Sequence, residues 1–195
     1  MAVLSECAYS KSPYSKADLL AQIATFPEGH FTVEGPDGIP VGMSACLLVA
    51  DSEYPVDAAW SVATDGGRIS NHNPNGDVLY GVDTIIRHSL RGSGLGKALL
   101  QKRIELAHLL GGRTLRSGAR LTGFPLVAHR RTPHEYANSV VAGRTRDPSI
   151  SLCLSLGFKL RCVVSGYLED DPESLGFAAI MEYSVAASAH GEGRA

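Results

Sequence analysis

Three glycines at alternate positions, flanked by two basic residues, form the segment of this sequence best suited to bind a phosphate group. A predicted strand, 78–86, comes before the segment, and a predicted helix, 97–110, follows it. Glycine lets a ligand approach the backbone closely, and the unpaired N–H groups and dipole of a helix N-terminus favour negative charge. The spacing therefore predicts a pyrophosphate-binding loop made of Arg91, Gly92, Ser93, Gly94, Leu95, Gly96 and Lys97. The alternative is a glycine-rich turn that binds nothing.

Two familiar nucleotide-binding loops do not fit this spacing. A Walker A loop needs a glycine five residues before its Gly-Lys pair and a Ser or Thr after the lysine, and these positions hold Arg91 and Ala98. A dinucleotide fingerprint that starts at Gly92 needs a third glycine where Lys97 stands, and no clear ribose-binding acid follows. The loop is therefore predicted to bind neither a nucleoside triphosphate nor a dinucleotide.

Composition describes an ordinary globular chain. It has 195 residues, of which 44% are hydrophobic and 19% charged, and its net charge is −2. This length suffices for one domain with a sizeable core, and the charge does not indicate nucleic-acid binding. The apolar runs are too short to span a membrane and no secretory signal is visible, so we expect a cytoplasmic protein. Four cysteines far apart in sequence indicate reduced thiols and no metal site: Cys7, Cys46, Cys153 and Cys162.

The rest of the chain alternates predicted strands and helices without an internal repeat. A long polar loop, 51–77, comes before strand 78–86, and an acidic segment, 169–174, links the last two strands. We expect one α+β domain over residues 1–185 and a disordered tail over 186–195. The other predicted helices are 17–25, 133–142 and 147–156, and the other predicted strands are 29–33, 39–50, 114–119, 158–168 and 177–185.

Two charged residues stand at predicted buried positions. Strict alternation along strand 78–86 places Asp83 on one face with Leu79, Gly81 and Ile85. Desolvation on this partly apolar face would raise the pKa of Asp83 toward a value useful for a general base, although a structural carboxylate is an equal alternative. Arg103 is the polar exception on the apolar stripe of helix 97–110.

Arg91, Gly94 and Gly96 fit the pattern Arg-x-x-Gly-x-Gly, which resembles the acetyl-CoA loop of the GCN5-related N-acetyltransferase (GNAT) superfamily. Gly157-Phe158 matches the ending of a helix in that family, and the order of the elements from about residue 31 to 185 is the GNAT order. Some bacterial GNAT-like proteins share further features with this chain, which are Trp60, the polar run 72–76, Gly118-Ala119-Arg120, Asp147-Pro148 and the segment 167–174.

The resemblance implies a central mixed, mostly antiparallel β-sheet flanked by α-helices. It also implies transfer of an acetyl group from acetyl-CoA to an amine of a small molecule or peptide, by direct attack in a ternary complex and without a metal. The sheet would separate beside strand 78–86, where the backbone of Ile85 and Ile86 would bind the pantetheine arm and the amide of Ile86 would stabilise the oxyanion. A homodimer is compatible with the resemblance.

The proton-transfer residues depart from the family pattern. The family's thiolate acid is a tyrosine four residues before Gly-Phe, and that position holds Cys153, for which a buried structural thiol is the favoured interpretation. Tyr167 and Tyr136 are other sources of a phenol, and Asp83 or His72 is a candidate base. A bound water as proton relay is the alternative to a dedicated base.

Candidate substrate-binding residues are His72, Asn73 and Arg120. The basic segment 120–146 is either a site for an anionic substrate or the cofactor's 3′-phosphate, or a solvated surface. Because Cys153 replaces the usual tyrosine, a non-catalytic acyl-CoA-binding sensor or interaction module stays open beside the enzyme.

Overall fold

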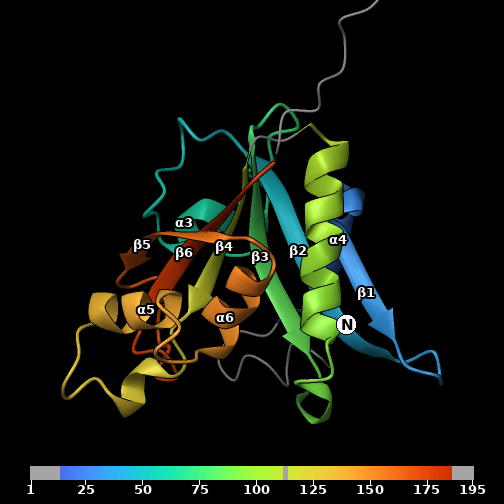
Figure 1. Cartoon of the computed structure of the whole chain (residues 1–195). Helices are drawn as coiled ribbons and strands as arrows, with labels where there is room; N and C mark the ends of the chain where they lie inside the picture. Colours follow the sequence, from blue (N-terminus) through green and yellow to red (C-terminus); the bar gives the residue numbers. More distant parts are fainter. Residues whose placement is uncertain (1–13, 112–113, 186–195) are drawn as a thin grey trace, which may run out of the picture.

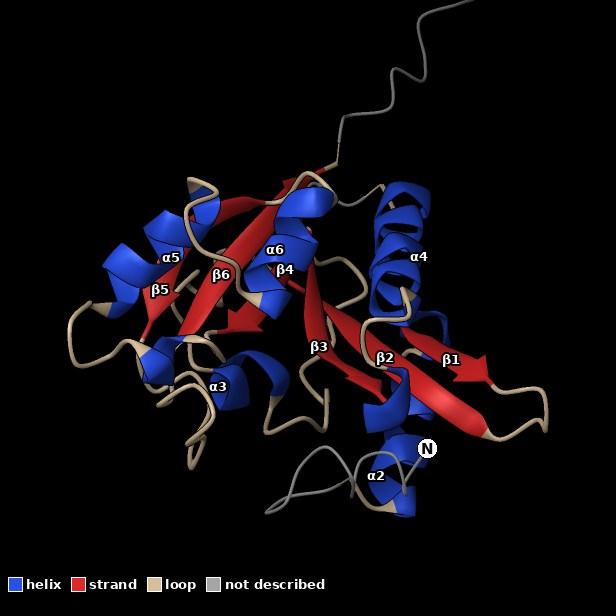
Figure 2. Ribbon diagram, turned by 60° about the horizontal axis from the view of Figure 1, so that its bottom comes forward, coloured by secondary structure: helices blue, strands red, loops and turns tan. Residues whose placement is uncertain are grey.

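One six-stranded sheet carries helices on both faces (Figures 1 and 2). The computed structural model describes residues 14–111 and 114–185, so the predicted tail and Cys7 lie outside the described residues. The helices are α2 (Lys16–Thr25), α3 (Trp60–Thr64), α4 (Leu95–Leu109), α5 (Pro133–Val141) and α6 (Pro148–Ser155), with single 3-10 turns η1 (Pro27–Gly29), η2 (His88–Leu90) and η3 (Phe124–Leu126). The strands are β1 (His30–Glu34), β2 (Pro40–Val49), β3 (Val78–Ile86), β4 (Thr114–Arg120), β5 (Lys159–Val164) and β6 (Ala178–Ser184).

The strand order is β1-β2-β3-β4-β6-β5, and only β3 and β4 are parallel neighbours. The predicted α+β class with a mixed, mostly antiparallel sheet is therefore confirmed. Pairing between β3 and β4 runs only from Val78–Thr114 to Gly81–Ser117. Beyond these residues the two strands separate, and the second half of β3 keeps only β2 as a neighbour. We call this opening the β3–β4 gap.

The helices form two layers. Helices α4 and α6 lie on one face of the sheet, whereas α2 and α3 lie on the other (Figure 2). A Cβ atom at Gly96 of α4 would stand 3.7 Å from Leu152 of α6, so these two helices touch near the start of α4. The main core cluster of buried residues includes Leu47 and Leu79 from the sheet and Leu100 from α4.

A β-bulge at Val82 overturns the predicted face of Asp83. The register shifts so that Ala45 pairs with Asp83 and Cys46 with Gly81, which leaves Val82 as the extra residue of β3. Gly81 faces α4, because a Cβ atom there would meet the Arg103 guanidinium at 2.5 Å. Asp83 lies on the opposite face, where Tyr14 hydrogen-bonds to it. The expectation that Asp83 shares a face with Gly81 was wrong, because strict alternation does not survive a bulge.

Local sequence explains most helix starts. Ser15 and Asp18 form a capping box at α2, Thr132 and Glu135 form one at α5, and Asp147 caps α6 by accepting two backbone N–H bonds. Helix α4 begins two residues before the predicted start, because Gly94 takes the N-cap position in the left-handed region.

The remaining differences concern loops. The predicted loop 51–77 contains α3, and the predicted strand 158–168 ends at Val164, before a turn at Gly166 with φ 65°. Cys46, Cys153 and Cys162 are free thiols. Within residues 14–111 and 114–185, no helix is both long enough and apolar enough to cross a membrane.

Candidate active site

The glycine loop leaves the N-terminus of α4 without a side-chain cap. Gly92 and Gly94 have φ values of 81° and 92°, which other residues adopt only with strain. The Ala98 amide donates to the Gly94 carbonyl at 3.0 Å, so the amides that precede Ala98 have no carbonyl of this helix to bind. Arg91 and Lys97 are both exposed at the ends of the loop. This geometry suits an anion with several oxygen atoms.

The backbone of β3 is open along the β3–β4 gap. The Arg87 amide donates to the Val41 carbonyl at 2.8 Å, so residues at alternate positions along this part of β3 point their amides toward β2. By the same alternation, the amides of Thr84 and Ile86 point into the gap, where β4 no longer pairs. Ile85 is buried, with its side chain packed in the cluster of Tyr14. The alternation thus favours Thr84 and Ile86, rather than Ile85, as main-chain donors.

Two phenols meet where the gap begins. The hydroxyls of Tyr80 and Tyr167 lie 3.0 Å apart, and both residues are buried. Tyr80 precedes Gly81, the last β3 residue that pairs with β4. A Cβ atom at Gly118, the first β4 residue beyond the pairing, would stand 2.0 Å from the Tyr167 hydroxyl oxygen. The Tyr167 phenol therefore lies against the backbone at the apex of the gap.

Trp60 fixes the segment that carries Tyr167. Its backbone amide donates to the Tyr167 carbonyl at 2.9 Å, and its indole N–H donates to the Val82 carbonyl at 2.8 Å. The Tyr167 amide donates in turn to the Gly176 carbonyl at 2.9 Å. The bulge in β3 and the link between β5 and β6 are thereby joined through one residue, by its backbone amide and its indole. This bridge holds the Tyr167 phenol at the apex.

Asp83 is a buried carboxyl with a perturbed acidity. Its exposed fraction is 7%, and its Oδ1 accepts from the Ala45 amide at 3.2 Å. Burial raises the pKa of Asp83 to about 6, against opposing effects of the Arg103 charge and hydrogen bonds from Tyr14 and Ala45. A carboxyl with this pKa is ionised at neutral pH and protonated slightly below it.

Cys153 lies on α6, and its side chain belongs to the main core cluster. It is 5% exposed, and burial raises the pKa of its thiol to about 12. An ordinary thiol has a pKa of about 8.5, so proton transfer from Cys153 to a thiolate would be uphill by about three units. This environment favours the structural interpretation of Cys153 over the acid.

His72 and Asn73 lie away from the gap. The His72 Nδ1 accepts from the Leu48 amide at 3.1 Å, its ring stacks on Phe26, and burial lowers its pKa. The Asn73 amide donates to the Leu48 carbonyl at 2.8 Å. Leu48 pairs with Leu79 at the start of β3, whereas the glycine loop follows its end. Strand rise puts these ends about 20 Å apart, so neither residue is brought to the glycine loop, and both lie beside the part of β3 that still pairs with β4.

Arg120, at the end of β4, is held by acidic residues. Its guanidinium donates to both carboxylate oxygens of Asp171 and to Glu173, which lies at 3.0 Å. Burial of Asp171 is outweighed by hydrogen bonds from Arg120 and Ser174, so the pKa of Asp171 is lowered. Arg120 therefore holds the link that carries Tyr167 against β4 and has its charge neutralised there.

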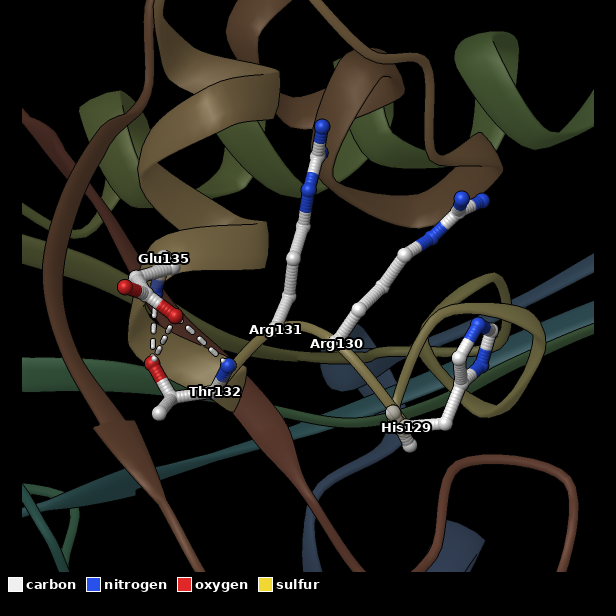
Figure 3. A pocket seen from close by; sticks show the side chains of 6 residues that line it. His129, Arg130, Arg131, Thr132 and Glu135 are labelled. Atoms are coloured by element: carbon white, nitrogen blue, oxygen red, sulfur yellow. Dashed lines mark hydrogen bonds between the residues drawn. The ribbon is translucent and has the colours of Figure 1, made fainter.

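The basic segment forms a separate hollow at the start of α5 (Figure 3). The hollow has a volume of about 260 Å³ and is lined by Ala128, His129, Arg130, Arg131, Thr132 and Glu135. Arg131 donates to the hydroxyls of Ser139 and Thr145, both at 3.2 Å, and Glu135 is bound to Thr132. Among the described residues, no carboxylate forms an ion pair with Arg130 or Arg131.

Comparison with curated proteins finds two relatives in Bacillus subtilis. The chain is 35% identical over 170 residues to the uncharacterized N-acetyltransferase YkwB, covering 87% of the chain and 74% of YkwB. It is 31% identical over 179 residues to the probable hydrolase YhcX, covering 92% of the chain. The chain spans only 35% of the length of YhcX, so most of that protein lies outside the matched part. No family model matches the sequence.

Solved structures share the fold. The GphF GNAT-like decarboxylase, in complex with isobutyryl-CoA, superimposes with a TM-score of 0.76 at 22% identity, covering 94% of this chain and 92% of GphF. The GNAT superfamily phosphinothricin acetyltransferase from Sinorhizobium meliloti, in complex with AcCoA, gives a TM-score of 0.54 at 14% identity, covering 90% of this chain and 72% of that enzyme. The fold predicted from the glycine loop and the order of elements is confirmed.

Proposed function

Because the chain belongs to the GCN5-related N-acetyltransferase (GNAT) superfamily, we propose that it transfers an acetyl group from acetyl-CoA to an amine of a small molecule or peptide. The amine nitrogen attacks the thioester carbonyl carbon, a C–N bond forms, the C–S bond breaks and the CoA sulfur takes a proton. One observation carries the proposal. The uncapped N-terminus of α4 follows, after the single turn η2, the strand whose backbone faces the β3–β4 gap.

The coenzyme occupies the side of α4 and α6 in this proposal. Its pyrophosphate binds the amides of Gly92 and of residues 94–97, since the Ser93 amide already donates to the Leu90 carbonyl at 3.3 Å, and Arg91 and Lys97 add positive charge at the two ends. A Cβ atom at Gly96 would meet only Leu152 within 4 Å among the described residues, so the space beside the first turn of α4 is otherwise open to the pyrophosphate. The pantetheine arm lies along the open edge of β3, where Thr84 and Ile86 offer their amides.

The same open amides stabilise the reaction's negative charge. When the amine attacks, the carbonyl oxygen becomes an oxyanion, and a fixed backbone donor in a site shielded from water lowers the energy of this state. Thr84 lies closer to the apex than Ile86, so we assign the oxyanion contact to Thr84 and the pantetheine contact to Ile86. This assignment moves the donor two residues from the one that the sequence suggested.

Tyr167 and Asp83 are the proposed proton-transfer groups. The Tyr167 phenol lies at the apex of the gap and donates a proton to the leaving thiolate, in place of a tyrosine on α6. Asp83 lies on the face of the sheet opposite α4 and takes the proton that the amine loses, directly or through a water. With a pKa of about 6, Asp83 is ionised at neutral pH and ready to accept.

A second candidate function is decarboxylation of a carboxyacyl-CoA. The greater similarity to the GphF decarboxylase, with a TM-score of 0.76 against 0.54 for the acetyltransferase, favours it. In that reaction a C–C bond breaks, CO₂ leaves, and the electron pair forms a thioester enolate that the same amides stabilise. A proton from Tyr167 to the carbanion carbon would complete the step.

One experiment separates these functions. The purified chain is incubated with acetyl-CoA and a panel of amines, and in parallel with malonyl-CoA alone, and the products are identified by mass spectrometry. Free CoA with an acetylated amine supports the transferase, and acetyl-CoA from malonyl-CoA supports the decarboxylase. CoA binding by calorimetry with neither product would identify an acyl-CoA-binding module and overturn both enzymatic proposals.

A further inference from the structure

Arg103 places a positive charge inside the buried stripe of α4. The residue is 3% exposed and packs against the sheet at Gly81. Burial of a guanidinium costs several kcal/mol unless hydrogen bonds and an opposite charge compensate it. The proposed acyl-transfer site makes no direct use of this charge, so its presence calls for another explanation.

The hydrogen bonds of Arg103 are incomplete. Its Nη2 donates to the Ala45 carbonyl at 3.0 Å, whereas its Nε has no hydrogen-bond partner among the described residues. Within residues 14–111 and 114–185, no carboxylate lies within ion-pair distance of Arg103. The absence of a side chain at Gly81 provides the space for the guanidinium, since a Cβ there would come to 2.5 Å of Nη1.

An opposite charge, Asp83, binds the same backbone residue, Ala45, from the other face of the sheet. Asp83 Oδ1 accepts from the Ala45 amide, and Arg103 donates to the Ala45 carbonyl. The carboxylate and the guanidinium thus bind the N–H and the C=O, respectively, of Ala45, beside the bulge at Val82. Two unlike charges on either side of one peptide segment attract each other strongly, because little water lies between them.

We propose that Arg103 is a positioning residue that keeps Asp83 ionised and fixed at the bulge, acting across the backbone of Ala45. The proposal rests on the proposed function, in which Asp83 accepts the proton of the amine. Without Arg103, the buried carboxyl would hold its proton to a higher pH and would be a poorer acceptor at neutral pH.

The other groups around this pair do not replace Arg103. Tyr14, which precedes α2, hydrogen-bonds to Asp83 but carries no charge at neutral pH. The charge of Arg103 also acts on the thiols of Cys46 on β2 and Cys153 on α6. Burial nevertheless raises the pKa of both thiols to about 12, so both remain neutral. Arg103 is the ionised group that opposes the charge of Asp83 from the helix side.

The test is a direct titration of Asp83 in the intact protein. Carboxyl ¹³C shifts are followed against pH in the wild type, in Arg103→Met and Arg103→Lys, and in Lys102→Met as a matched control, with Asp83→Asn to identify the signal. Lys102 is on the exposed face of the same helix and pairs with Glu105 at 2.7 Å. We expect the Asp83 midpoint to rise by about one to three units in Arg103→Met and by less in Arg103→Lys. It should not change in Lys102→Met.

An unchanged Asp83 midpoint in Arg103→Met would overturn the proposal. Should that variant not fold, Gly81→Ala serves in its place, because the added Cβ displaces the guanidinium while the charge is kept. The acid limb of kcat/KM against pH is measured beside the titration. If the Asp83 midpoint moves and the acid limb does not, Arg103 still positions Asp83, but the role of Asp83 in the proposed function fails.

Discussion

Replacement of Tyr167 by phenylalanine removes one atom from the apex of the β3–β4 gap. The ring keeps its packing against Gly118 and its backbone keeps the bond from Trp60, so the local fold is retained. What is lost is the hydroxyl that lies 3.0 Å from the hydroxyl of Tyr80. If this phenol protonates the leaving thiolate, the variant loses general acid catalysis, which contributes a factor of about 10²–10⁴.

The cost in stability follows from the same contact. Tyr80 is buried, so loss of its partner leaves a desolvated hydroxyl, at a cost of about 1–3 kcal/mol. In a domain of this size, that cost lowers Tm by about 2–4 °C per kcal/mol. Stability and turnover must therefore be measured together, because a fall in activity at assay temperature has to be separated from unfolding.

Tyr80→Phe is the matched control. It removes the same hydrogen bond from the other side, so its effect on Tm should be similar, but it leaves the Tyr167 hydroxyl in place. Burial raises the pKa of Tyr80 to about 12, which suits a neutral donor that stabilises a Tyr167 phenolate after proton transfer. We therefore expect Tyr80→Phe to lose about tenfold in kcat, a smaller loss than that of Tyr167→Phe.

The assay is release of free CoA thiol from acetyl-CoA, with an amine that the panel identifies as an acceptor. Thermal unfolding of both variants is recorded under the same conditions. Equal losses of kcat in the two variants, or a Tyr167→Phe variant within tenfold of wild type, would refute the assignment of Tyr167 as the acid. Such a result would leave Cys153 or a water molecule as the candidate acid for the leaving thiolate.

Three further predictions concern the loop, the base and α6. Gly96→Val should weaken CoA binding by at least about a hundredfold, which is about 2.7 kcal/mol by calorimetry. Ala98→Val, on the same helix, should bind CoA normally. Equal affinities of the two variants would contradict the assignment of the glycine loop as the pyrophosphate site. Because burial raises the folded-state pKa of Asp83 to about 6, the folded protein binds the extra proton between about pH 4 and 6. Wild type should therefore lose about 2 kcal/mol relative to Asp83→Asn as pH rises from 4 to 7, by urea unfolding at each pH, and parallel curves would contradict this burial. Cys153→Ala should keep kcat within about twofold and lose about 1 kcal/mol of stability, and a hundredfold fall in kcat would make the thiol the acid.

The fold was accessible from sequence because its signals are local and ordered. Turn and cap residues such as Asp147 mark element ends directly, and the glycine loop identifies the junction between β3 and α4. The short helix α3 was missed, because five residues without a side-chain cap give little periodic signal. The order of the predicted strands and helices along the chain then indicated the sheet topology, which turn and cap residues alone do not determine.

The candidate site was less accessible because its contacts are distant in sequence. Tyr80 and Tyr167 are 87 residues apart, and no spacing rule connects them. Tyr80 was not a candidate at all, since an aromatic residue in a buried strand suggests packing. Arg120 was predicted at the substrate from the basic segment that it begins, and its acidic partners, 51 and 53 residues away, could not be recognised from sequence. A polar residue in a loop, such as His72, becomes a candidate from its residue type alone, whether or not the fold brings it to the active site.

The bulge at Val82 explains several features of the site as one event. One extra residue in β3 turns Asp83 to the face of α2, whereas Gly81 stays against Arg103. The same irregularity leaves the Val82 carbonyl to the indole of Trp60, which in turn holds the link that carries Tyr167. Pairing with β4 also ends at Gly81, so the gap begins where the bulge begins. A bulge places a side chain where regular alternation would not, and here it sets the positions of the gap, the buried carboxyl and the phenol relative to one another.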